Sequence, residues 1–516
     1  MRVASIDLGS NSFHLLVVDA SADGHFVPLA RDKEVLRFGD MVSREGRITE
    51  AGLAKAIATI QRFKAQADGL GATEIMASAT SAVRDADNGG EVIDAIYAAT
   101  GVRVGLLSGL EEARLIFQAV RASVVIDPGP ALCLDLGGGS LEVMLGGPEG
   151  LLRAATLPLG VGRLTTELVR DDPPSADDAR RLQERITATL APVAEEMAGF
   201  RPTMAVATSG TFSDLARMAV ARRTGAVPAS LNQVTVTREE IEALHGDIMA
   251  STVVQRTKMA GLDARRADQM PAGLMVATVA MELFGIAELT MSAWALREGI
   301  VLEVIGRADP ALWTSDAHAI RRSSVLGLAR RCNWDEAHSR HVARLALALF
   351  DATTKLHGFG ADERELLEHA SLLHDIGTHV AHESHHKHTA YLIQHGKLRG
   401  YDPEQVDALA CLARYHRRGE PKQSHEPFNT LPADVQDQVT KLAALLRIAD
   451  GLDLSHTGTV TGIDVDVDKS RVRIDVSGSG DLQMELWGAR RKRQLFEKVF
   501  GRRLEFAAAR SRRKAG

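Results

Sequence analysis

Residues 134–142 read Leu-Asp-Leu-Gly-Gly-Gly-Ser-Leu-Glu and predict a strand, a glycine turn and a second strand. Three consecutive glycines leave the backbone N–H groups of the turn unshielded, so that they can donate hydrogen bonds to a cluster of anionic oxygens. Asp135 and Glu142 flank the turn with carboxylates, the ligands that Mg²⁺ prefers beside a phosphate group. Gly-Gly-Gly-Ser also occurs in plain hairpins and linkers, so the stretch needs a second signal.

That second signal lies near the N-terminus, where residues 6–15 repeat the pattern. They read Ile-Asp-Leu-Gly-Ser-Asn-Ser-Phe-His-Leu and share Asp-Leu-Gly-x-x-Ser followed by an apolar strand. A repeat at domain spacing indicates two duplicated lobes, each of which offers one turn to a shared phosphate site. The alternative interpretation is that both stretches are ordinary turns.

Composition limits the class of protein. The chain has 516 residues, more than one core normally organises, and 45% of them are hydrophobic. We expect about three or four domains. The formal net charge of −6 excludes a globally basic protein, so no nucleic-acid partner is expected.

The cysteines and the N-terminus bear on location. Cys133, Cys332 and Cys411 are far apart and lack the spacing of metal ligands, so we expect reduced thiols. Asp7 falls where a signal peptide would need its apolar core, and no apolar run approaches the roughly 20 residues that span a bilayer. We therefore expect a cytoplasmic protein without a membrane partner.

A helix predicted to start after Ser108 places one carboxylate among apolar side chains. Ser108 and Glu111 form a capping-box pattern, which gives Glu111 a structural role at the start of the helix. Glu112 instead shares a face with Leu115 and Ile116, where an ionised group is unfavourable unless it lines a cleft or binds a ligand. Burial there would raise the pKa of Glu112 toward the range of a general base. The alternative is a carboxylate stabilised by the helix dipole, which would apply equally to Glu111.

Two further stretches supply candidate phosphate contacts. Residues 75–84 predict a short strand that ends in hydroxyl side chains and Arg84, which is either a phosphate ligand or a solvated loop arginine. Residues 205–212 predict an apolar strand that runs into a small hydroxylated turn. The chain contains no Walker-type Gly-x-x-x-x-Gly-Lys-Ser/Thr motif, which argues against a P-loop NTPase.

Helical periodicity dominates from about residue 309, and histidines become frequent there. His338 lies on the inward face of one predicted helix, the His374-Asp375 pair ends another, and Asp450 continues the inward face of a third. Together these side chains could converge on a divalent metal. Each of them alone is more often a hydrogen-bonded core residue.

Two basic segments and an alternating C-terminal region complete the chain. Residues 385–388 and 414–418 are rich in His, Arg and Lys and predict a cationic band, which is either a solvated face or a track for a polyanion. Beyond residue 458, strands and a helix alternate, which predicts a small α+β module. Residues 510–514 predict a disordered basic tail.

With these motifs the chain resembles the exopolyphosphatase / guanosine pentaphosphate phosphohydrolase family over nearly its whole length. The resemblance rests on residues 6–13, 80–84, 108–114, 135–142, 208–211, 266–273 and 296–299. It implies a multidomain α/β plus α protein with two ribonuclease-H-like lobes, as in actin, sugar kinases and Hsp70. It further implies an HD-like all-α domain, a small α+β C-terminal domain and a homodimer. The expected domains span residues 1–122, 123–306, 309–457 and 458–516.

The resemblance also implies roles for individual residues. Glu112 would activate the attacking water, and Asp135 and Glu142 would hold Mg²⁺. His338, His374, Asp375 and Asp450 match the metal-binding signature of the HD-like domain, which would hold another divalent metal as a second phosphohydrolase centre or be an inherited scaffold. Phosphate contacts are expected from Asp7, Ser10, Asn11, Ser12, Arg84, Gly137, Gly138, Gly139, Ser140, Ser209, Gly210, Thr211 and Arg266.

The resulting hypothesis is Mg²⁺-assisted hydrolysis of terminal phosphoanhydride bonds, with processive release of orthophosphate from inorganic polyphosphate and conversion of pppGpp to ppGpp as a further reaction. The first alternatives are an enzyme that prefers pppGpp and a non-catalytic polyphosphate or alarmone binder. The others are an ATP-dependent kinase on the same fold and a protein whose chemistry resides in the HD-like domain.

Overall fold

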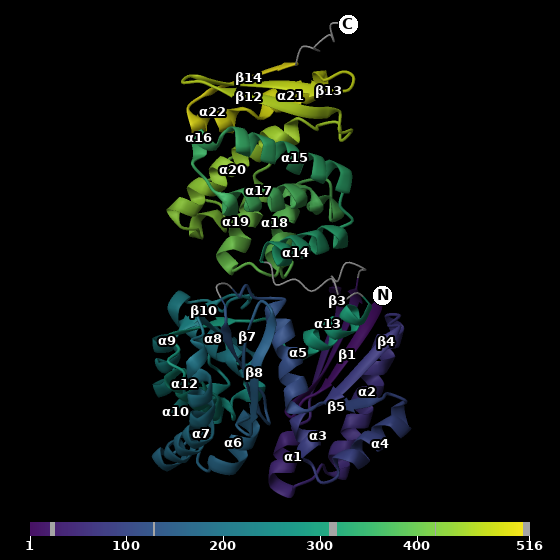
Figure 1. Ribbon diagram of the computed structural model, residues 1–516, viewed down its shortest axis with the longest axis vertical. Coiled ribbons are helices and arrows are strands. Elements are labelled where there is room, and N and C mark those ends of the chain that lie inside the picture. Colours follow the sequence, from purple (N-terminus) through teal and green to yellow (C-terminus); the bar gives the residue numbers. More distant parts are fainter. Residues whose placement is uncertain (21–25, 127–128, 309–316, 418, 509–516) are drawn as a thin grey trace. The chain divides into compact units, whose positions relative to one another are not determined.

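The computed structural model describes residues 1–20, 26–126, 129–308, 317–417 and 419–508 (Figure 1). The chain divides into two compact units, Met1–Ile320 and Arg321–Gly516. The first unit carries both glycine turns, and the second carries the histidine-rich region. The basic tail expected at residues 510–514 lies outside the described residues.

Two sheets form the framework of the first unit. Their strands are β1 Arg2–Leu8, β2 Ser12–Ala20, β3 Phe26–Val35, β4 Glu74–Ala79, β5 Val104–Leu106, β6 Ala131–Leu136, β7 Leu141–Gly147, β8 Gly150–Leu157, β9 Met204–Thr208, β10 Thr235–Thr237 and β11 Glu288–Met291. The strand orders are β3-β2-β1-β4-β5 and β10-β11-β9-β6-β7-β8. In both sheets an antiparallel meander is followed by two parallel strands, so the topology repeats. This repeat confirms the duplicated lobes predicted from the two turns.

The glycine turns occupy equivalent places in the two sheets. Asp135 pairs directly with Glu142 across the β6–β7 hairpin, and Asp7 pairs with His14 across the β1–β2 hairpin. Four residues separate the innermost paired positions of each hairpin. Strands β6 and β7 are buried at every position, as expected for central strands that are covered on both faces.

Helices cover the two sheets. Among the described residues of the first unit they are α1 Phe38–Glu45, α2 Glu50–Gly69, α3 Ser81–Asp85, α4 Gly89–Thr100, α5 Gly109–Arg121, α6 Val161–Leu168, α7 Ala176–Met197, α8 Ser209–Thr224, α9 Arg238–Glu242, α10 His245–Met249, α11 Val253–Arg256, α12 Met270–Leu283 and α13 Leu296–Ala308. Short 3-10 turns occur at Ala198–Phe200 and Ala264–Arg266.

Helix α5 lies between the two sheets (Figure 1). Its Phe117 belongs to one hydrophobic cluster with Cys133 and Met144 of the second sheet, whereas its Ala119 belongs to a cluster with Val3 of the first sheet. Helix α13 packs on α5 and also contacts β1 and β2. Because α5 and α13 contribute to the cores of both lobes, the lobe boundaries expected near residues 122 and 306 stay predictions.

The second unit begins with helices and ends with a sheet. Its elements are α14 Ala317–Arg331, which begins before the unit boundary, α15 Glu336–Ala352, α16 Thr354–His357, α17 Ala361–Leu373, α18 His385–His395, α19 Pro403–Arg414, α20 Ala433–Gly451, β12 Val460–Val467, β13 Arg471–Gly478, α21 Gln483–Lys492, α22 Gln494–Phe500 and β14 Arg503–Ala508. Further 3-10 turns occur at Ile376–His379 and Phe428–Thr430.

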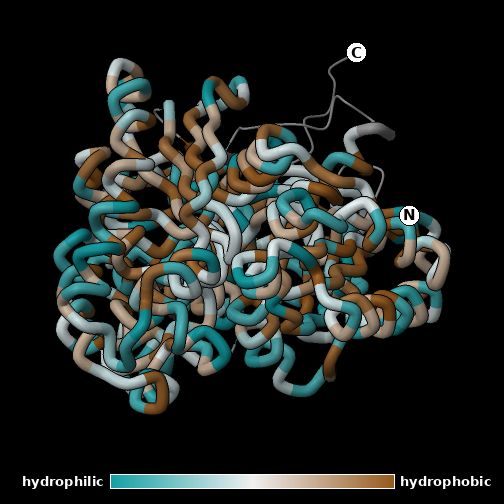
Figure 2. The backbone as a smooth tube through the Cα atoms, turned by 90° about the horizontal axis from the view of Figure 1, so that it is seen from below, coloured by the Kyte–Doolittle hydropathy of each residue, from teal (hydrophilic) through white to brown (hydrophobic). Residues whose placement is uncertain are grey.

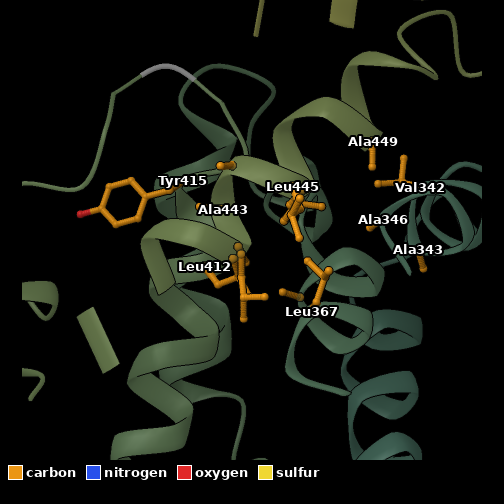
Figure 3. Packing of buried hydrophobic residues seen from close by; sticks show 14 of the residues in the cluster. Val342, Ala343, Ala346, Leu367, Leu412, Tyr415, Ala443, Leu445 and Ala449 are labelled. Atoms are coloured by element: carbon orange, nitrogen blue, oxygen red, sulfur yellow. The ribbon is translucent and has the colours of Figure 1, made fainter. Parts of the chain in front are cut away.

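Apolar side chains from four helices form the core of this unit. Val342 of α15, Leu367 of α17, Leu412 of α19 and Leu445 of α20 lie together in one buried cluster (Figure 3). Each helix contributes one face, and Figure 2 shows the same pattern along the chain, where hydrophobic and hydrophilic stretches alternate within single helices. The histidines that share these faces are therefore drawn inward.

The C-terminal strands form a three-stranded sheet in the order β12-β13-β14. Val472 and Leu504 of this sheet belong to the same hydrophobic cluster as Leu442 of α20, and α21 packs on both α20 and β14. The strands and helix expected after residue 458 are present, but the domain boundary expected there stays a prediction because the core is continuous.

Two general expectations can be compared with the structure. Cys133, Cys332 and Cys411 are free and buried, as expected for reduced thiols. Of the helices in the described residues, none is both long enough and apolar enough to cross a membrane.

Candidate active site

Four carboxylates from both lobes meet where α5 approaches the two hairpins. Asp7 lies near the end of β1, Asp135 near the end of β6, Glu142 at the start of β7 and Glu112 in the first turn of α5. Glu112 is 7% exposed and Glu142 is 1% exposed. The structure thus brings together the three residues expected to act on water and metal, and adds Asp7 to them.

These carboxylates raise one another's pKa values. Burial raises the pKa of Glu112 to about 8 against the opposing charge of Arg84, and the charges of Asp7 and Asp135 add to the rise. Burial and the charge of Asp7 raise the pKa of Asp135 to about 7. Burial, Glu112 and Asp135 raise the pKa of Glu142 well above its usual range. Ionising all four groups together is therefore costly unless a cation joins them.

The donor atoms fit such a cation. Asp7 Oδ1 and Glu142 Oε1 are buried and have no hydrogen-bond partner in the protein. A buried polar atom without a partner costs free energy, so these oxygens need a ligand of their own. The donor set consists of carboxylate oxygens, which suit a hard divalent ion rather than a soft one. The unpartnered oxygens of Asp7 and Glu142 are therefore the donors that a cation at this cluster would use.

The pKa shifts predict how stability depends on pH in the metal-free protein. The pKa of Glu142 is raised in the folded state, so its contribution is retained at low pH and lost as the pH rises through that folded value. In chelator, we expect Glu142→Gln to unfold at a higher temperature than the unchanged protein. The difference should grow from about pH 5 to about pH 8 and reach roughly 5 °C. Thermal unfolding across this range measures it, and a difference that shrinks with pH would contradict the burial argument.

Neighbouring glutamates on α5 have opposite environments. Glu111 is exposed and completes the capping box, because the Ser108 backbone N–H donates to Glu111 Oε2 at 2.9 Å and the Glu111 N–H donates to Ser108 Oγ at 3.2 Å. Glu112 points inward, and its Oε2 lies 3.4 Å from Arg84 Nη1. That guanidinium also donates to the Leu107 carbonyl oxygen at 2.7 Å, which fixes its position. Both the capping box and the inward face of Glu112 agree with the sequence pattern.

The two glycine loops face each other at very short range. A Cβ atom on Gly139 would lie 2.1 Å from Ser81 Oγ and 2.6 Å from Ser10 Oγ, and one on Gly138 would lie 3.0 Å from Asn11 Cβ. Only glycine fits at this distance, so the loop of the second lobe presents bare backbone to the first lobe. The sequence repeat predicts that each lobe offers one turn to a shared site, and the two turns do lie next to each other.

A pair of glycine variants tests this approach. We expect Gly139→Ala to destabilise the protein by roughly 1–3 kcal/mol and to raise the KM for a phosphate-chain substrate, because the methyl group pushes the loops apart. A Cβ atom on Gly137 would meet only the Ser140 carbonyl oxygen, at an ordinary 3.5 Å. Gly137→Ala should therefore stay within about 0.5 kcal/mol of the unchanged protein. Urea unfolding and steady-state kinetics give both values, and equal effects of the two variants would contradict the close approach.

Ion pairs also join the lobes around the loops. Arg37 binds Asp268 with both guanidinium nitrogens, Nη1 to Oδ2 at 2.5 Å and Nη2 to Oδ1 at 3.1 Å. Arg163 pairs with Asp85 at 2.5 Å and donates from Nε to the Gly139 carbonyl oxygen at 3.2 Å. The sequence analysis did not identify Arg163, although it supports the glycine loop directly.

The expected phosphate contact at residues 209–211 forms the start of α8 rather than an open turn. Ser209 has a positive φ of 85°, and its Oγ donates to the Leu136 carbonyl oxygen at 2.8 Å. Arg266 Nη1 donates to the Gly210 carbonyl oxygen at 3.2 Å and to Asp214 Oδ2 at 2.7 Å. The guanidinium of Arg266 thus already has a carboxylate partner and supports this loop.

The remaining expected contacts lie within or beside the loops. Ser12, Ser140 and Thr211 are buried, and Ser10 Oγ accepts a hydrogen bond from the Ala82 N–H at 3.1 Å. Asn11 Nδ2 reaches across the lobes and donates to Gln269 Oε1 at 3.3 Å. Their side chains hold the loops in place.

Arg297 is a site residue that the sequence analysis missed. It lies in the first turn of α13, and its charge opposes the burial that raises the pKa values of Asp7 and Asp135. Its Nη1 lies 3.0 Å from His14 Nδ1. The motif at residues 296–299 carried part of the family resemblance, but no local pattern connects residue 297 with residue 7.

In the second unit the four expected metal ligands also come together. His338 Nε2 lies 3.2 Å from His374 Nε2 and 4.0 Å from Asp375 Oδ2, and His374 Nε2 lies 4.0 Å from Asp450 Oδ1. They come from α15, from the end of α17 and from α20. The atoms of His338, His374 and Asp450 are close enough to share one metal ion.

The cationic band expected from residues 385–388 and 414–418 is a surface feature only in part: Lys387 is exposed, Arg414 and Arg417 are half-buried, and residue 418 lies outside the described residues. His385, His386 and His416 are buried. Helix α18 packs on α19, so His385 and His386 of its first turn are buried while Lys387 faces solvent.

Comparison with known proteins identifies the family. A model described as the Ppx/GppA phosphatase family matches residues 17–308, and one described as Ppx/GppA phosphatase, domain III, matches residues 320–478. The chain belongs to the Ppx/GppA phosphatase family. The lobes, the glycine loops and the carboxylate cluster of this family member all lie within or directly before the first matched segment.

Two relatives of this Ppx/GppA phosphatase are named for different substrates. Exopolyphosphatase 1 of Mycobacterium tuberculosis is 42% identical over 306 residues, which cover 58% of this chain and 88% of that protein. The guanosine-5'-triphosphate,3'-diphosphate pyrophosphatase of Aeromonas hydrophila is 28% identical over 464 residues, 89% of this chain and 88% of that protein.

Solved structures agree with the fold of the first unit. The crystal structure of an exopolyphosphatase from Cytophaga hutchinsonii is 28% identical in sequence and superimposes with a TM-score of 0.57. The match covers 60% of this chain and 98% of the Cytophaga chain. The Ppx/GppA family member of Aquifex aeolicus is 26% identical in sequence, with a TM-score of 0.52. That match covers 60% of this chain and 99% of the Aquifex chain. The duplicated α/β lobes of this Ppx/GppA phosphatase therefore have the actin-like fold of these neighbours.

Proposed function

We propose that this Ppx/GppA phosphatase hydrolyses the terminal phosphoanhydride bond of inorganic polyphosphate and releases orthophosphate one unit at a time. The observation that carries the proposal is the meeting of buried Glu112 with Asp7, Asp135 and Glu142 beside two facing glycine loops. The name of the Mycobacterium tuberculosis relative, at 42% identity, supports polyphosphate as the substrate.

Glu112 is the general base in this proposal. Burial raises its pKa to about 8, close to the pH at which a base must both accept and release a proton. A water held by the Glu112 carboxylate loses one proton to it as its oxygen forms a bond to the terminal phosphorus. The bond from that phosphorus to the bridging oxygen breaks, and the shortened chain leaves with the electron pair. Arg84, 3.4 Å from Glu112 Oε2, orients the carboxylate.

The glycine loops bind the terminal phosphoryl group in this proposal. Backbone N–H groups of Gly137, Gly138 and Gly139 are unshielded by side chains and suit anionic oxygens. Asn11 and Ser10 extend the same surface from the first lobe. Fixed donors of this kind contribute most of the stabilisation in phosphoryl transfer, because they need no rearrangement as charge develops.

Mg²⁺ is the cofactor that we propose for the carboxylate cluster. Asp135, Glu142 and Asp7 would hold it, and the unpaired oxygen of Asp7 favours metal binding over the direct phosphate contact expected from the sequence. When bound, Mg²⁺ neutralises negative charge on the phosphoryl oxygens.

A second candidate substrate is pppGpp. The Aeromonas hydrophila relative, named for a guanosine substrate, matches 89% of this chain, whereas the Mycobacterium tuberculosis exopolyphosphatase matches 58%. The longer match extends into the second unit. We further propose that the second unit is HD-like and binds a divalent metal through His338, His374, Asp375 and Asp450.

The deciding experiment measures orthophosphate release from long-chain polyphosphate and from pppGpp side by side. We expect release from polyphosphate in Mg²⁺ and none after chelation. A parallel assay with ATP and candidate acceptors should yield no acceptor-dependent ADP, which separates hydrolysis from a kinase reaction. Tight binding of both substrates without release in Mg²⁺ would overturn the proposal in favour of a non-catalytic binder. The implied homodimer stays a prediction that light scattering tests.

A further inference from the structure

Each glycine loop is anchored to its own lobe by the helix that follows the third strand of the meander. The Gly39 N–H of α1 donates to the Ser10 carbonyl oxygen at 2.8 Å, and the Gly162 N–H of α6 donates to the Gly138 carbonyl oxygen at 2.9 Å. Ser10 and Gly138 occupy the same position in the repeated motif Asp-Leu-Gly-x-x-Ser. The duplicated lobes therefore anchor their loops in the same way.

Arg37 connects the loop of the first lobe with the second lobe. It is the N-cap residue of α1, and its backbone N–H donates to the Asn11 carbonyl oxygen at 2.9 Å. Its guanidinium binds both oxygens of Asp268 and donates to the Arg265 carbonyl oxygen at 3.1 Å. Asp268 directly precedes Gln269, which accepts a hydrogen bond from the Asn11 side chain. Arg37 has a φ of 55°, in the left-handed region that residues other than glycine rarely adopt, so the surrounding fold holds it there against strain.

Arg163 makes the corresponding connection from the loop of the second lobe. It lies in the first turn of α6, and its Nε donates to the Gly139 carbonyl oxygen at 3.2 Å. Its Nη2 pairs with Asp85 of the first lobe at 2.5 Å. Asp85 ends α3, the short helix whose Ser81 lies against Gly139. Each loop is thus tied to the opposite lobe by one arginine–aspartate pair.

These two cross-lobe pairs, Arg37–Asp268 and Arg163–Asp85, act on the spacing of the loops, because each arginine contacts its own loop and also the opposite lobe. We propose that Arg37 and Arg163 are positioning residues that hold the two glycine loops at the distance at which both contact one terminal phosphoryl group. The role rests on the proposed function, since that phosphoryl group is the ligand the loops share. It goes beyond the proposed function by assigning the spacing of the loops to two residues that act through the loop backbone.

The rival interpretation is that the cross-lobe pairs are ordinary surface ion pairs. Their four side chains are between 22% and 38% exposed, and pairs of this kind contribute little to the stability of a fold. A small contribution is sufficient, however, when it acts on the equilibrium between lobes that are together and lobes that are apart. Arg222 and Asp247 pair at 2.5 Å within the second lobe and provide a matched comparison that cannot affect this equilibrium directly.

Steady-state kinetics with polyphosphate measures the effect. If the lobes of a variant are apart for part of the time, only the closed fraction binds the chain, so KM rises by the inverse of that fraction and kcat at saturation is retained. Replacing the aspartates leaves the bonds from the arginines to the loops intact. We expect Asp268→Asn and Asp85→Asn each to raise KM roughly 2- to 10-fold with kcat within about twofold. Asp247→Asn should change neither constant by more than about twofold.

Charge reversal separates positioning from local stability. Asp268→Arg places two guanidinium groups opposite each other and should raise KM further than Asp268→Asn does. Adding Arg37→Asp restores a pair of opposite charges, and aspartate tolerates the left-handed backbone at this position. KM should then fall at least about threefold from its value in Asp268→Arg. A role of Arg37 confined to the start of α1 would instead add a second defect and leave KM high.

The distance between the lobes provides a readout that needs no catalysis. Spin labels on Ala54→Cys in α2 and Ala188→Cys in α7 occupy exposed positions on the two lobes, and the three native cysteines are buried. In the substrate-free protein, the combined Asp85→Asn and Asp268→Asn variant should show an added population at longer distance. The Asp247→Asn protein should match the unchanged protein. If the combined variant does not fold, labelled Asp268→Arg takes its place.

Two results would overturn the positioning role. One is an unchanged KM in both single aspartate variants, and the other is an unchanged distance distribution when both cross-lobe pairs are broken. Because the label distance is measured without substrate, absence of polyphosphate hydrolysis would count against the proposed function and leave the distance measurement intact. An unchanged distance would conversely leave polyphosphate hydrolysis by the first unit in place.

Discussion

Glu112→Gln should lower kcat for orthophosphate release from polyphosphate by roughly 10²–10⁴-fold and change KM little. The amide keeps the shape and the burial of the side chain but cannot accept the proton of the attacking water. The rise of kcat with pH that reflects deprotonation of Glu112 should also disappear, because the buried carboxyl whose raised pKa produces this rise is no longer present. Steady-state release assays between about pH 6 and about pH 9 measure both effects.

The adjacent glutamate provides a matched control. Glu111→Gln removes an exposed carboxylate from the same helical turn, and because glutamine at this position also completes a capping box, the free energy of unfolding should change little. Its kcat should stay within about twofold of the unchanged protein, since a surface change of this size acts on stability rather than on chemistry. Undiminished release by Glu112→Gln, or an equal loss in both variants, would remove Glu112 from the role of base.

Asp135→Asn should reduce kcat/KM by roughly 100-fold or more at moderate Mg²⁺ and raise the Mg²⁺ concentration needed for half-maximal rate. The substitution removes one of the carboxylates that we propose as metal ligands but keeps the size of the side chain. In chelator the same variant should be more stable than the unchanged protein. Burial and Asp7 raise the pKa of Asp135 to about 7, so this carboxyl lowers the stability of the metal-free fold progressively as the pH rises toward that value.

This opposite movement of activity and stability distinguishes a metal ligand from a structural carboxylate. Asp178 is the control, because it is buried at the start of α7 and accepts hydrogen bonds from the backbone N–H groups of Asp171 and Ser175. These bonds hold the pKa of Asp178 below its usual value despite its burial. Asp178→Asn should therefore lower the unfolding temperature and leave the Mg²⁺ dependence unchanged. A fall in metal-free stability for Asp135→Asn would show that its charge supports the fold.

Much of the site could be predicted from the sequence because its parts are local. A hairpin turn of consecutive glycines between carboxylates is specified within nine residues, and its repetition near the N-terminus predicts the second lobe. The capping box separates Glu111 from Glu112 by helical geometry alone. The inward direction of His338 and Asp450 likewise follows from the period of their helices.

The tertiary structure alone decided which distant residues meet. The charge of Arg297 lowers the pKa of Asp7, and the Ser81 hydroxyl packs against the backbone of Gly139. Nothing in the spacing of these residues along the sequence predicts either interaction. His385 was grouped with a cationic surface for the same reason. A histidine in a basic segment has the pattern of a solvated residue until the packing of its helix is known.

The sequence by itself therefore determined the chemical groups of this protein and the local backbone that carries them, because turns, caps and helical faces depend on residues a few positions apart. The tertiary structure decided which of those groups share one site, because burial and charge at a point in space are summed over every segment that packs there. Glu112 shows both parts: its helix predicts an inward face, but burial by the surrounding segments, together with the charges of one arginine and two other carboxylates, sets its pKa.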